Sequence, residues 1–399
     1  MLNKIPNLRH LHAALQIADQ GSISSAARAV HLSQSAVTQA ILRLEQTAGA
    51  ALFERTVDGM RATAAGQLFV RRIRRAFGYL QRLDRQLGDT GPAIGPLFRT
   101  ATATQLRALI AVVRFGGFSL AARELGVAQP SVHRAAKDLE RLTESSLFQR
   151  TATGTEATRL ARKLARSASL GFAEIRHAFE EVAEVHGQVR GVITVGCLPL
   201  GRAGLLPDAA TALMQRYADA QMHIIEGPYH ELLHGLQEGY IDLIIGALRE
   251  PATSRRIDQR ALFTDSLSLL VRADHPLLNA PTPTDAELLK LAWVLPRSGT
   301  PARMQFNDYF TERKLPVPSS VIECSSLVAT RGLLLRSDRA AVLSTRQVAL
   351  ELKTGMLAKL AGPLPGTERQ IGIATRTGWQ ATRLQAAFIE ALESAVENL

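Results

Sequence analysis

Residues 21–37, GSISSAARAVHLSQSAV, decide how the first half of this chain is organised, because the same pattern returns at residues 116–132 as GGFSLAARELGVAQPSV. The two copies are offset by 95 positions (116 − 21) and stay in register without a gap. Identical pairs at this offset include Ser24/Ser119, Ala26/Ala121, Ala27/Ala122, Arg28/Arg123, Gln34/Gln129, Leu44/Leu139, Phe53/Phe148 and Arg55/Arg150. A repeat of this kind indicates one supersecondary unit that is used twice.

Each copy is expected to form three helices. In copy one, the spacing of apolar residues predicts a first helix that ends near Gly21. Ser24 is expected to cap a short second helix, and Ser33 a third helix that runs to about Ala48 before Gly49. Two short helices joined by a tight turn form a helix-turn-helix, whose second helix enters the major groove of DNA. The alternative interpretation is an ordinary helical hairpin.

The outward face of the third helix carries side chains that suit DNA. Glutamine can bond adenine bidentately, and arginine suits guanine or phosphate. Phosphate contacts position a protein on DNA, whereas base contacts specify the sequence. We therefore expect Gln34 and Ser35 to read bases and the arginines to supply affinity, although any one of these residues could be plain solvated surface. The candidate DNA-binding residues are Ser33, Gln34, Ser35, Thr38, Gln39, Arg43, Gln129, Ser131 and Arg134, with Arg55, Arg61 and Arg150 on a small wing after each third helix.

The positive charge of the chain is confined to its first half. Lysine and arginine outnumber acidic residues by 25 − 15 = +10 over residues 1–187, and by 22 − 21 = +1 over residues 188–399. This segregation is expected if one half meets a polyanion and the other does not, so double-stranded DNA is the predicted partner.

Composition also indicates a compartment. The two cysteines, Cys197 and Cys324, form no disulfide framework, so a reducing cytoplasm is expected. The N-terminal segment lacks the apolar core of a signal peptide, and no apolar stretch reaches the roughly 20 residues that span a bilayer, so no membrane association is expected.

Several short motifs resemble the LysR-type transcriptional regulators. They are the Ser-Gln-Ser-Ala-Val run from Ser33, the Leu-Glu pair at Leu44, the Leu-Phe-Glu-Arg run from Leu52 and the Thr-Ala-Ala-Gly run from Thr63. The resemblance covers nearly the whole chain. It implies a multidomain fold: α-helical winged helix-turn-helix units, a long linker helix and an α/β effector domain with two lobes, like a periplasmic binding protein. It also implies homodimers or homotetramers and contact with RNA polymerase.

One departure from the family plan is the number of winged units, which is two here instead of one. Copy two is less regular, because Glu144 replaces Gly49 and Ala136 replaces Ile41. Copy two could therefore bind DNA weakly or serve as a scaffold. The expected division of the chain is a winged unit (1–65), a linker (66–95), a second winged unit (96–157), a linker helix (158–188) and an effector domain (189–399), with lobe one at 190–275 and 366–396 and lobe two at 276–365.

The two linkers are expected to contain amphipathic helices, at residues 66–87 and at about 158–185, and each needs a partner for its apolar stripe. Residues 88–98, GDTGPAIGPLF, are predicted to be a true linker because of their glycines and prolines. In the family this helix pairs with that of a second subunit. Our hypothesis is that the two helices of this chain pair with each other, and the alternative is pairing between chains.

From about Arg190 the pattern changes to alternating strands and helices, which predicts a mostly parallel sheet. Effector domains of the resembled family bind ligands in a cleft at the carboxyl ends of strands, where helix N-termini favour anions. The expected effector is a carboxylate or an acidic sugar. The hydroxyls could equally be plain helix caps, and Cys197 is expected to be a packing residue rather than a redox sensor. The candidate effector-binding residues are Cys197, Leu198, Pro199, Arg297, Ser298, Thr300, Arg303 and Ser325.

Other functional classes are weighed against this interpretation. No nucleophile elbow or glycine-rich phosphate loop is found, so neither an enzyme nor a cofactor is expected. His230 and His234, spaced as i and i+4, could share a metal ion, but no third ligand is evident. The remaining rival is a DNA-binding architectural protein without ligand control.

Overall fold

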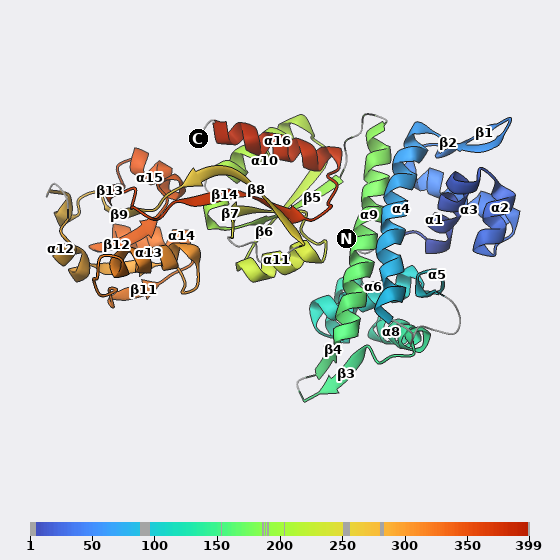
Figure 1. The fold of residues 1–399 in the computed structure, drawn as a ribbon, viewed down its shortest axis with the longest axis horizontal. Helices are drawn as coiled ribbons and strands as arrows, with labels where there is room; N and C mark the ends of the chain where they lie inside the picture. The colour runs from blue at the N-terminus through green and yellow to red at the C-terminus, as the bar shows by residue number, and fades with distance from the viewer. Residues whose placement is uncertain are drawn as a thin grey trace.

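Two winged units lie on a pair of long helices, and two α/β lobes follow in a row (Figure 1). The structure is a computed structural model, which describes residues 5–87, 96–152, 154–185, 187, 189, 191–202, 204–249, 256–279 and 283–397. Most of the expected linker, residues 88–95, lies outside the described residues.

Copy one is built as the sequence predicts, with one correction. Helices α1 (Leu8–Gln20), α2 (Ile23–Val30) and α3 (Gln34–Ala48) precede a hairpin of β1 (Phe53–Thr56) and β2 (Gly59–Ala62). Ser33 caps α3, and Gly49 ends it in the left-handed conformation at φ 71°. The expected cap of α2 was wrong: Ser22 caps this helix, and the Ser24 hydroxyl accepts a bond from Gln34 Nε2 at 2.6 Å.

Copy two repeats this arrangement after a short helix α5 (Leu97–Thr100). It consists of α6 (Ala103–Phe115), α7 (Phe118–Leu125), α8 (Gln129–Thr143), β3 (Phe148–Thr151) and β4 (Gly154–Ala157). Equivalent carboxylates make equivalent bonds: Glu45 Oε1 accepts from the backbone N–H of Leu52 at 2.8 Å, and Glu140 Oε1 accepts from that of Leu147 at 2.8 Å. Glu144 takes the left-handed position of Gly49 at φ 47°, which costs a residue with a Cβ about 1 kcal/mol.

Helices α4 (Ala64–Leu87) and α9 (Arg159–Val185) pair within the chain in antiparallel orientation. Phe69 packs edge-on against Phe179, and Arg75 pairs with Glu174. Later residues of α4 therefore contact earlier residues of α9, as an antiparallel pair requires. A Cβ added to Gly171 would lie 3.2 Å from the carbonyl oxygen of Ala76, so the two helix backbones lie close together at this glycine. The helix pairing that we expected within one chain is thus present in the structure.

The helix pair is held by charge as well as by apolar contact. Arg72 is 1% exposed. Its Nε donates to Glu181 Oε1 at 2.9 Å, and its Nη1 donates to Glu174 Oε2 at 3.0 Å. A buried cluster of apolar residues runs from α1 through α4 and α9 into α6 and joins the two winged units, while a second cluster lies among α6, α7 and α8. The N-terminal half is therefore one packed body.

Lobe one contains a five-stranded sheet of order β6-β5-β7-β14-β8. Its strands are β5 (Gly191–Cys197), β6 (Ala220–Glu226), β7 (Leu243–Ala247), β8 (Ile257–Asp265) and β14 (Arg369–Arg376). Helices α10 (Leu205–Arg216), α11 (Tyr229–Gln237) and α16 (Arg383–Glu397) accompany it, with a 3₁₀ turn η2 (Pro199–Arg202) after β5.

Lobe two contains a second five-stranded sheet of order β11-β10-β12-β9-β13. Its strands are β9 (Ser268–Arg272), β10 (Ala292–Leu295), β11 (Val321–Glu323), β12 (Arg339–Leu343) and β13 (Leu357–Ala361). Its helices are α12 (Asp285–Lys290), α13 (Pro301–Thr311), α14 (Leu327–Leu335) and α15 (Ala349–Lys353), with 3₁₀ turns η3 (Pro276–Asn279) and η4 (Thr345–Val348).

Two expectations for this half were wrong. The sheets are mixed rather than mostly parallel, because β14 runs antiparallel to β7 and β8, and β9 runs antiparallel to β12 and β13. Strand β9 belongs to the second sheet, so the chain enters lobe two after Asp265 and not at residue 276. Two strands, β8 and β13, were not expected at all.

Over the described residues, no single helix is long and apolar enough to cross a bilayer. The bent pair α6–α7 meets that test only when its two helices are taken together, at an angle of 118°.

Candidate DNA interface and effector cleft

The expected DNA-reading residues of copy one lie on the solvent side of α3. Gln34, Ser35, Thr38, Gln39 and Arg43 are exposed, whereas Val37, Ile41 and Leu44 are buried on the opposite side. The bond from Gln34 Nε2 to Ser24 fixes the glutamine side chain at the start of the helix. The Ser33 hydroxyl caps the helix and also lies 3.0 Å from the Ser35 hydroxyl. The first turn of α3 is thereby ordered before any DNA arrives.

The hairpin after α3 separates its two arginines. In the β1–β2 register, Arg61 lies opposite Glu54, and Arg55 lies opposite Met60. Side chains alternate between the two faces of a hairpin, so Arg55 and Arg61 point to different faces. Glu54 shares the face of Arg61 and would compete with a phosphate there. In copy two, Arg150 lies opposite Thr155 and occupies the place of Arg55.

The outward face of α8 is more basic than that of α3. Ser131 is exposed, and Gln129 Oε1 accepts a bond from the Ser119 hydroxyl at 3.2 Å. Acidic residues on this face lie toward the C-terminal part of the helix, where Asp138 pairs with Arg141 and Glu140 with Lys137. Six side chains of the helix line one open groove: Gln129, Pro130, His133, Arg134, Lys137 and Arg141.

At the junction between the lobes, the segment after β5 is mostly buried. Turn η2, which follows β5, contacts η4 of lobe two, so this end of the strand faces the other lobe. Cys197 and Leu198 are buried, and the backbone N–H of Leu198 donates to Ile245 O at 2.9 Å. Of the three candidates here, Pro199 alone is exposed. Cys197 thus packs in the core of lobe one, as expected.

The candidates of lobe two surround the carboxyl end of β10. Thr300 caps α13 by accepting from the backbone N–H of Arg303, and Arg297 and Ser298 are exposed. Glu323, at the end of β11, accepts from the backbone N–H of Ser298 at 3.1 Å and lies 3.9 Å from Arg303 Nη1. A protein carboxylate therefore occupies the position expected for an anion.

The neighbouring helix α14 begins in the same region of lobe two. Ser326 caps it by accepting from the backbone N–H of Ala329 at 3.2 Å, so this hydroxyl is a plain helix cap in the structure. The candidate Ser325 precedes the cap and is exposed.

A buried hinge between the lobes escaped sequence reasoning. Asp265 ends β8, Arg369 begins β14, and Ser344 follows β12 of lobe two. Asp265 Oδ2 accepts from Arg369 Nη2 at 2.9 Å, and its Oδ1 accepts from the Ser344 hydroxyl at 2.6 Å. One carboxylate therefore ties both crossing strands of lobe one to lobe two.

The far end of β14 reaches the DNA-binding half. Arg75 Nη2 donates to Gly378 O at 2.9 Å, and Arg72 Nη1 donates to Gln380 O at 3.0 Å. The same interface buries titratable groups of α9. Burial raises the pKa of Glu180 to about 7 and holds the pKa of His177 well below its usual value. No sequence signal pointed to this junction, because its partners are far apart in the chain.

Over the described residues, no group of three or more histidine, cysteine or acidic side chains is placed to hold a metal ion. His230 and His234 are exposed on α11, and His234 lies 3.9 Å from Glu238. Neither Cys197 nor Cys324 forms a disulfide.

Known protein families match both halves of the chain. The model "LysR substrate binding domain" matches residues 186–397. The model "Bacterial regulatory helix-turn-helix protein, lysR family" matches twice, at residues 8–67 and 103–162. The second match agrees with the 95-residue offset between the two copies.

Individual relatives support the same assignment. The HTH-type transcriptional regulator GalR of Pseudomonas putida is 32% identical over 98% of both chains, so the extra length of this chain has a counterpart there. The structure of a full-length OxyR variant from Pseudomonas aeruginosa (TM-score 0.53, 22% identity) covers 73% of this chain and 97% of its own. The full-length CbnR structure in complex with its target DNA (TM-score 0.51, 20% identity) covers 73% of this chain and 98% of its own.

Proposed function

The chain belongs to the LysR family of bacterial helix-turn-helix regulators, and we propose that α3 and α8 both bind duplex DNA under control of a small molecule held between the two lobes. It is a transcription regulator with an effector domain and not an enzyme. The observation that carries the DNA-binding proposal is the pair of exposed helix faces, whose first two turns hold amide, hydroxyl and basic side chains and no acidic residue.

For DNA, we assign base contacts to Gln34, Ser35, Thr38 and Gln39 and phosphate contacts to Arg55 and Arg150. The remaining candidates support these contacts: Ser33, Arg43, Arg61, Gln129, Ser131 and Arg134. DNA affinity falls with salt because each phosphate contact releases counterions. Replacing Arg55 by alanine should reduce the slope of log affinity against log salt by about 1.

The experiment selects genomic fragments that bind the full-length protein and measures affinity by fluorescence anisotropy over a range of salt concentrations. Arg336→Ala is the matched control, since Arg336 is exposed in lobe two at the C-terminal end of α14. Absence of any salt-sensitive binding, or an unchanged slope for Arg55→Ala together with unchanged affinity for Gln34→Ala, would contradict the proposal.

For the effector, we propose a small carboxylate or an acidic sugar that displaces Glu323 from Ser298 and pairs with Arg297 and Arg303. The displacement is chemically reasonable because the ligand would present the same acceptor atoms to the same donors. Pro199, Thr300 and Ser325 would line the site. The segment Cys197–Leu198 would contribute as a buried support rather than by direct contact.

Thermal-shift screening of small carboxylates and sugars tests this assignment. A ligand that binds only the folded protein raises the melting temperature. The shift should disappear in Arg297→Ala and persist in Arg313→Ala, since Arg313 lies beyond the C-terminal end of α13 over the Tyr309 ring. If no compound in either class stabilises the protein, this effector class is wrong.

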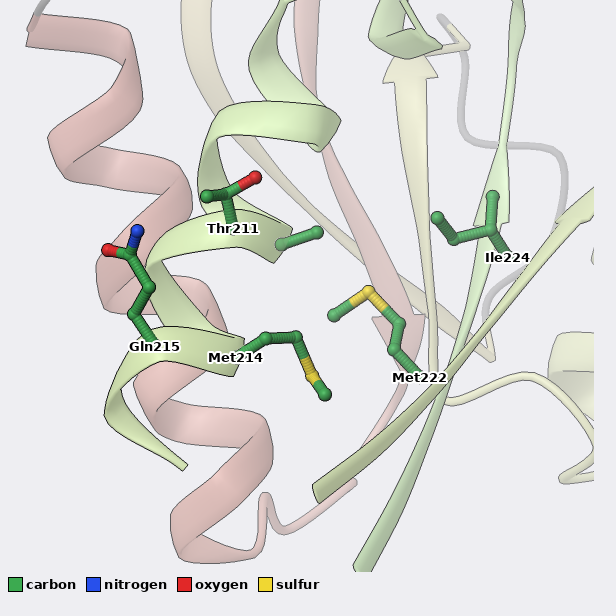
Figure 2. Close-up of a pocket in the computed structure, with 6 residues that line it drawn as sticks. Thr211, Met214, Gln215, Met222 and Ile224 are labelled. Carbon is green, nitrogen blue, oxygen red and sulfur yellow. The ribbon is translucent and has the colours of Figure 1, made fainter. Parts of the chain in front are cut away.

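For assembly, we propose homodimers or homotetramers that form through the face of α10 and β6. Strand β6 is an edge of its sheet, and Met214, Ile224 and Ile225 are exposed there. Figure 2 shows that Met214 and Met222 point into the space between α10 and β6. An exposed apolar edge strand favours pairing with another chain. Ile224→Glu should lower the mass measured by light scattering, and an unchanged mass would rule out this face.

The cellular setting is part of the same proposal. We place the protein in the cytoplasm, where free thiols persist and promoter DNA is accessible. Contact with RNA polymerase would follow from binding beside a promoter. Residues 1–65 and 96–157 would be the DNA-binding domains, 66–95 and 158–188 the linkers, and 189–399 the effector domain.

A further inference from the structure

The two winged units keep one scaffold but present different reading faces. At the 95-residue offset, the buried residues of the recognition helices agree, as Val37 does with Val132 and Leu44 with Leu139. The glutamine that anchors each helix also keeps its hydroxyl neighbour, in the pairs Gln34–Ser24 and Gln129–Ser119. The helices are therefore positioned alike within their units.

The outward positions, by contrast, differ almost throughout. Their pairs across the repeat are Ser35/Pro130, Thr38/His133, Gln39/Arg134, Leu42/Lys137 and Arg43/Asp138. The change from Gln39 to Arg134 replaces a side chain that suits adenine with one that suits guanine. A unit that only served as a scaffold would have no need of the cations Arg134 and Lys137, which are both exposed and stand at the positions of Gln39 and Leu42.

The helix pair relates the two units by an approximate two-fold rotation. Ala76 and Gly171, which meet where α4 and α9 cross, are themselves equivalent in the repeat (171 − 76 = 95). An antiparallel pair that crosses at equivalent residues has its two-fold axis at the crossing. Two helix-turn-helix units related in this way bind half-sites one DNA turn apart or a multiple of it.

The pairing is specific to α4 with α9. If α4 paired with the α4 of another chain, the positions that face Arg72 would hold Tyr79 and Gln86 in place of Glu174 and Glu181. The buried guanidinium would then lack its carboxylates, which is strongly unfavourable. Each pair of winged units is therefore made of one copy-one unit and one copy-two unit.

From these observations we propose that a single chain recognises an asymmetric operator, with two half-sites of different sequence, one read by α3 and the other by α8. This inference rests on the proposed DNA binding and deepens it. Base preference in the first half-site is set by Thr38 and Gln39, and in the second by His133 and Arg134. A protein with one kind of winged unit would instead bind an inverted repeat.

The test is selection of DNA from a random library by the full-length protein. The expected motif has two dissimilar blocks, with centres about one helical turn or a multiple of it apart. The variant Thr38→Ala/Gln39→Ala should lose sequence preference in one block only, and His133→Ala/Arg134→Ala in the other. Each variant should bind the wild-type motif roughly 5- to 150-fold more weakly. Arg336→Ala, an exposed change in lobe two at the C-terminal end of α14, is the control.

A face transplant gives a sharper result. The chain with Pro130→Ser, His133→Thr, Arg134→Gln, Lys137→Leu and Asp138→Arg carries the outward residues of α3 on both recognition helices, and it should select an inverted repeat of the first block. A wild-type motif that is already an inverted repeat, or that consists of one block insensitive to the α8 variants, overturns the inference while leaving DNA binding intact. If the wild-type protein enriches no sequence at all, the proposed DNA binding itself fails.

Discussion

At the scale of single residues, Arg72 is a buried cation on α4 that contacts both α9 and the effector domain. It is buried between two carboxylates, and it also donates to the backbone carbonyl of Gln380 in the effector domain. A surface arginine would gain little from such partners, because solvent screens exposed ion pairs. In a buried cluster, removal of one charged partner leaves the others buried without compensation, which is strongly destabilising.

Arg72→Ala should lower the free energy of unfolding by roughly 3–5 kcal/mol, because it leaves Glu174 and Glu181 buried without their cation. Urea unfolding followed by circular dichroism measures the change. Arg74→Ala is the control: Arg74 is mostly exposed beside Asp19, and its removal should cost about 1 kcal/mol or less. Equal losses of unfolding free energy for the two variants would show that the buried ion pairs of Arg72 contribute no more than an exposed pair does.

Glu180 gives the protein a pH dependence of known sign. Burial raises its pKa to about 7, so the folded protein holds this proton more tightly than the unfolded chain does. The stability that this proton contributes is complete below about pH 4.5 and is lost as the pH rises through about 7. His177 acts in the opposite direction: its lowered pKa gives stability that is lost as the pH falls through and below its usual range.

The contribution of Glu180 can be isolated by the Glu180→Gln variant, which keeps the shape but does not ionise. This variant should melt several degrees above the wild type at pH 8 and at about the same temperature at pH 5. Differential scanning fluorimetry at both values gives the comparison. If the melting temperatures of Glu180→Gln and the wild type differed by the same amount at pH 5 and at pH 8, the raised pKa of Glu180 would be refuted as the cause.

Residue-level prediction from sequence succeeded where the signal is local. Ser33 and Gly49 follow directly from the preferences of helix ends, and the true cap Ser22 lies only two positions from the expected Ser24. The partners of Arg72 could not be predicted, because they lie 102 and 109 positions away. The same holds for Asp265, whose hinge role depends on Ser344 and Arg369.

At the scale of elements, the crossing of α4 and α9 is the contact that makes two winged units into one body. Gly171 permits it, since a Cβ there would lie 3.2 Å from both Ala76 O and the Leu80 side chain. Gly78 is a matched helical glycine on α4, and a Cβ there would meet no atom within 4 Å.

Gly171→Leu should therefore separate the helices and lower the melting temperature of the N-terminal half by several degrees, since overpacking typically costs about 1–3 kcal/mol. Gly78→Leu should have little effect. Thermal unfolding monitored by circular dichroism at 222 nm compares them. Equal melting temperatures for Gly171→Leu and Gly78→Leu would show that the close packing at Gly171 does not stabilise the helix pair.

The elements that sequence reasoning missed share a physical cause. Strands β8 and β13 are the outer strands of their sheets. Charged residues interrupt the apolar residues of both strands, Asp258 and Arg260 in β8 and Lys359 in β13, so their pattern is weak. The sequence pattern showed the alternation of strands and helices, which predicts a parallel sheet. It did not show that β14 and β9 run antiparallel to their neighbours.

At the scale of the whole molecule, β14 connects the effector lobes to the DNA-binding half. One end of the strand holds Arg369, which pairs with Asp265 at the hinge. The segment after its other end offers carbonyls to Arg72 and Arg75 on α4. We propose that a ligand that shifts the lobes would move the hinge end of this strand, and that the contacts of Arg72 and Arg75 at its other end would carry the shift to the helix pair.

The overall organisation was largely predictable, since the repeat and the charge segregation lie in the sequence and the resemblance to the LysR-type regulators implies the two lobes. The pairing of α4 with α9 was one of two alternatives that the sequence left open. The carboxylates of α9 that face Arg72 favour pairing of α4 with α9 over pairing of two α4 helices, and they could be placed only once the packing of the two helices was known.

The most direct test of this account asks whether α4 and α9 pair within one chain in solution. Phe179, which packs against Phe69, is replaced by the photoreactive benzoyl-phenylalanine in full-length protein, and chains labelled with ¹⁴N and ¹⁵N are mixed, unfolded and refolded together. After illumination, mass spectrometry should find peptides cross-linked between α9 and α4 that are wholly ¹⁴N or wholly ¹⁵N. Cross-linked peptides of mixed isotope content would show pairing between chains and contradict the account.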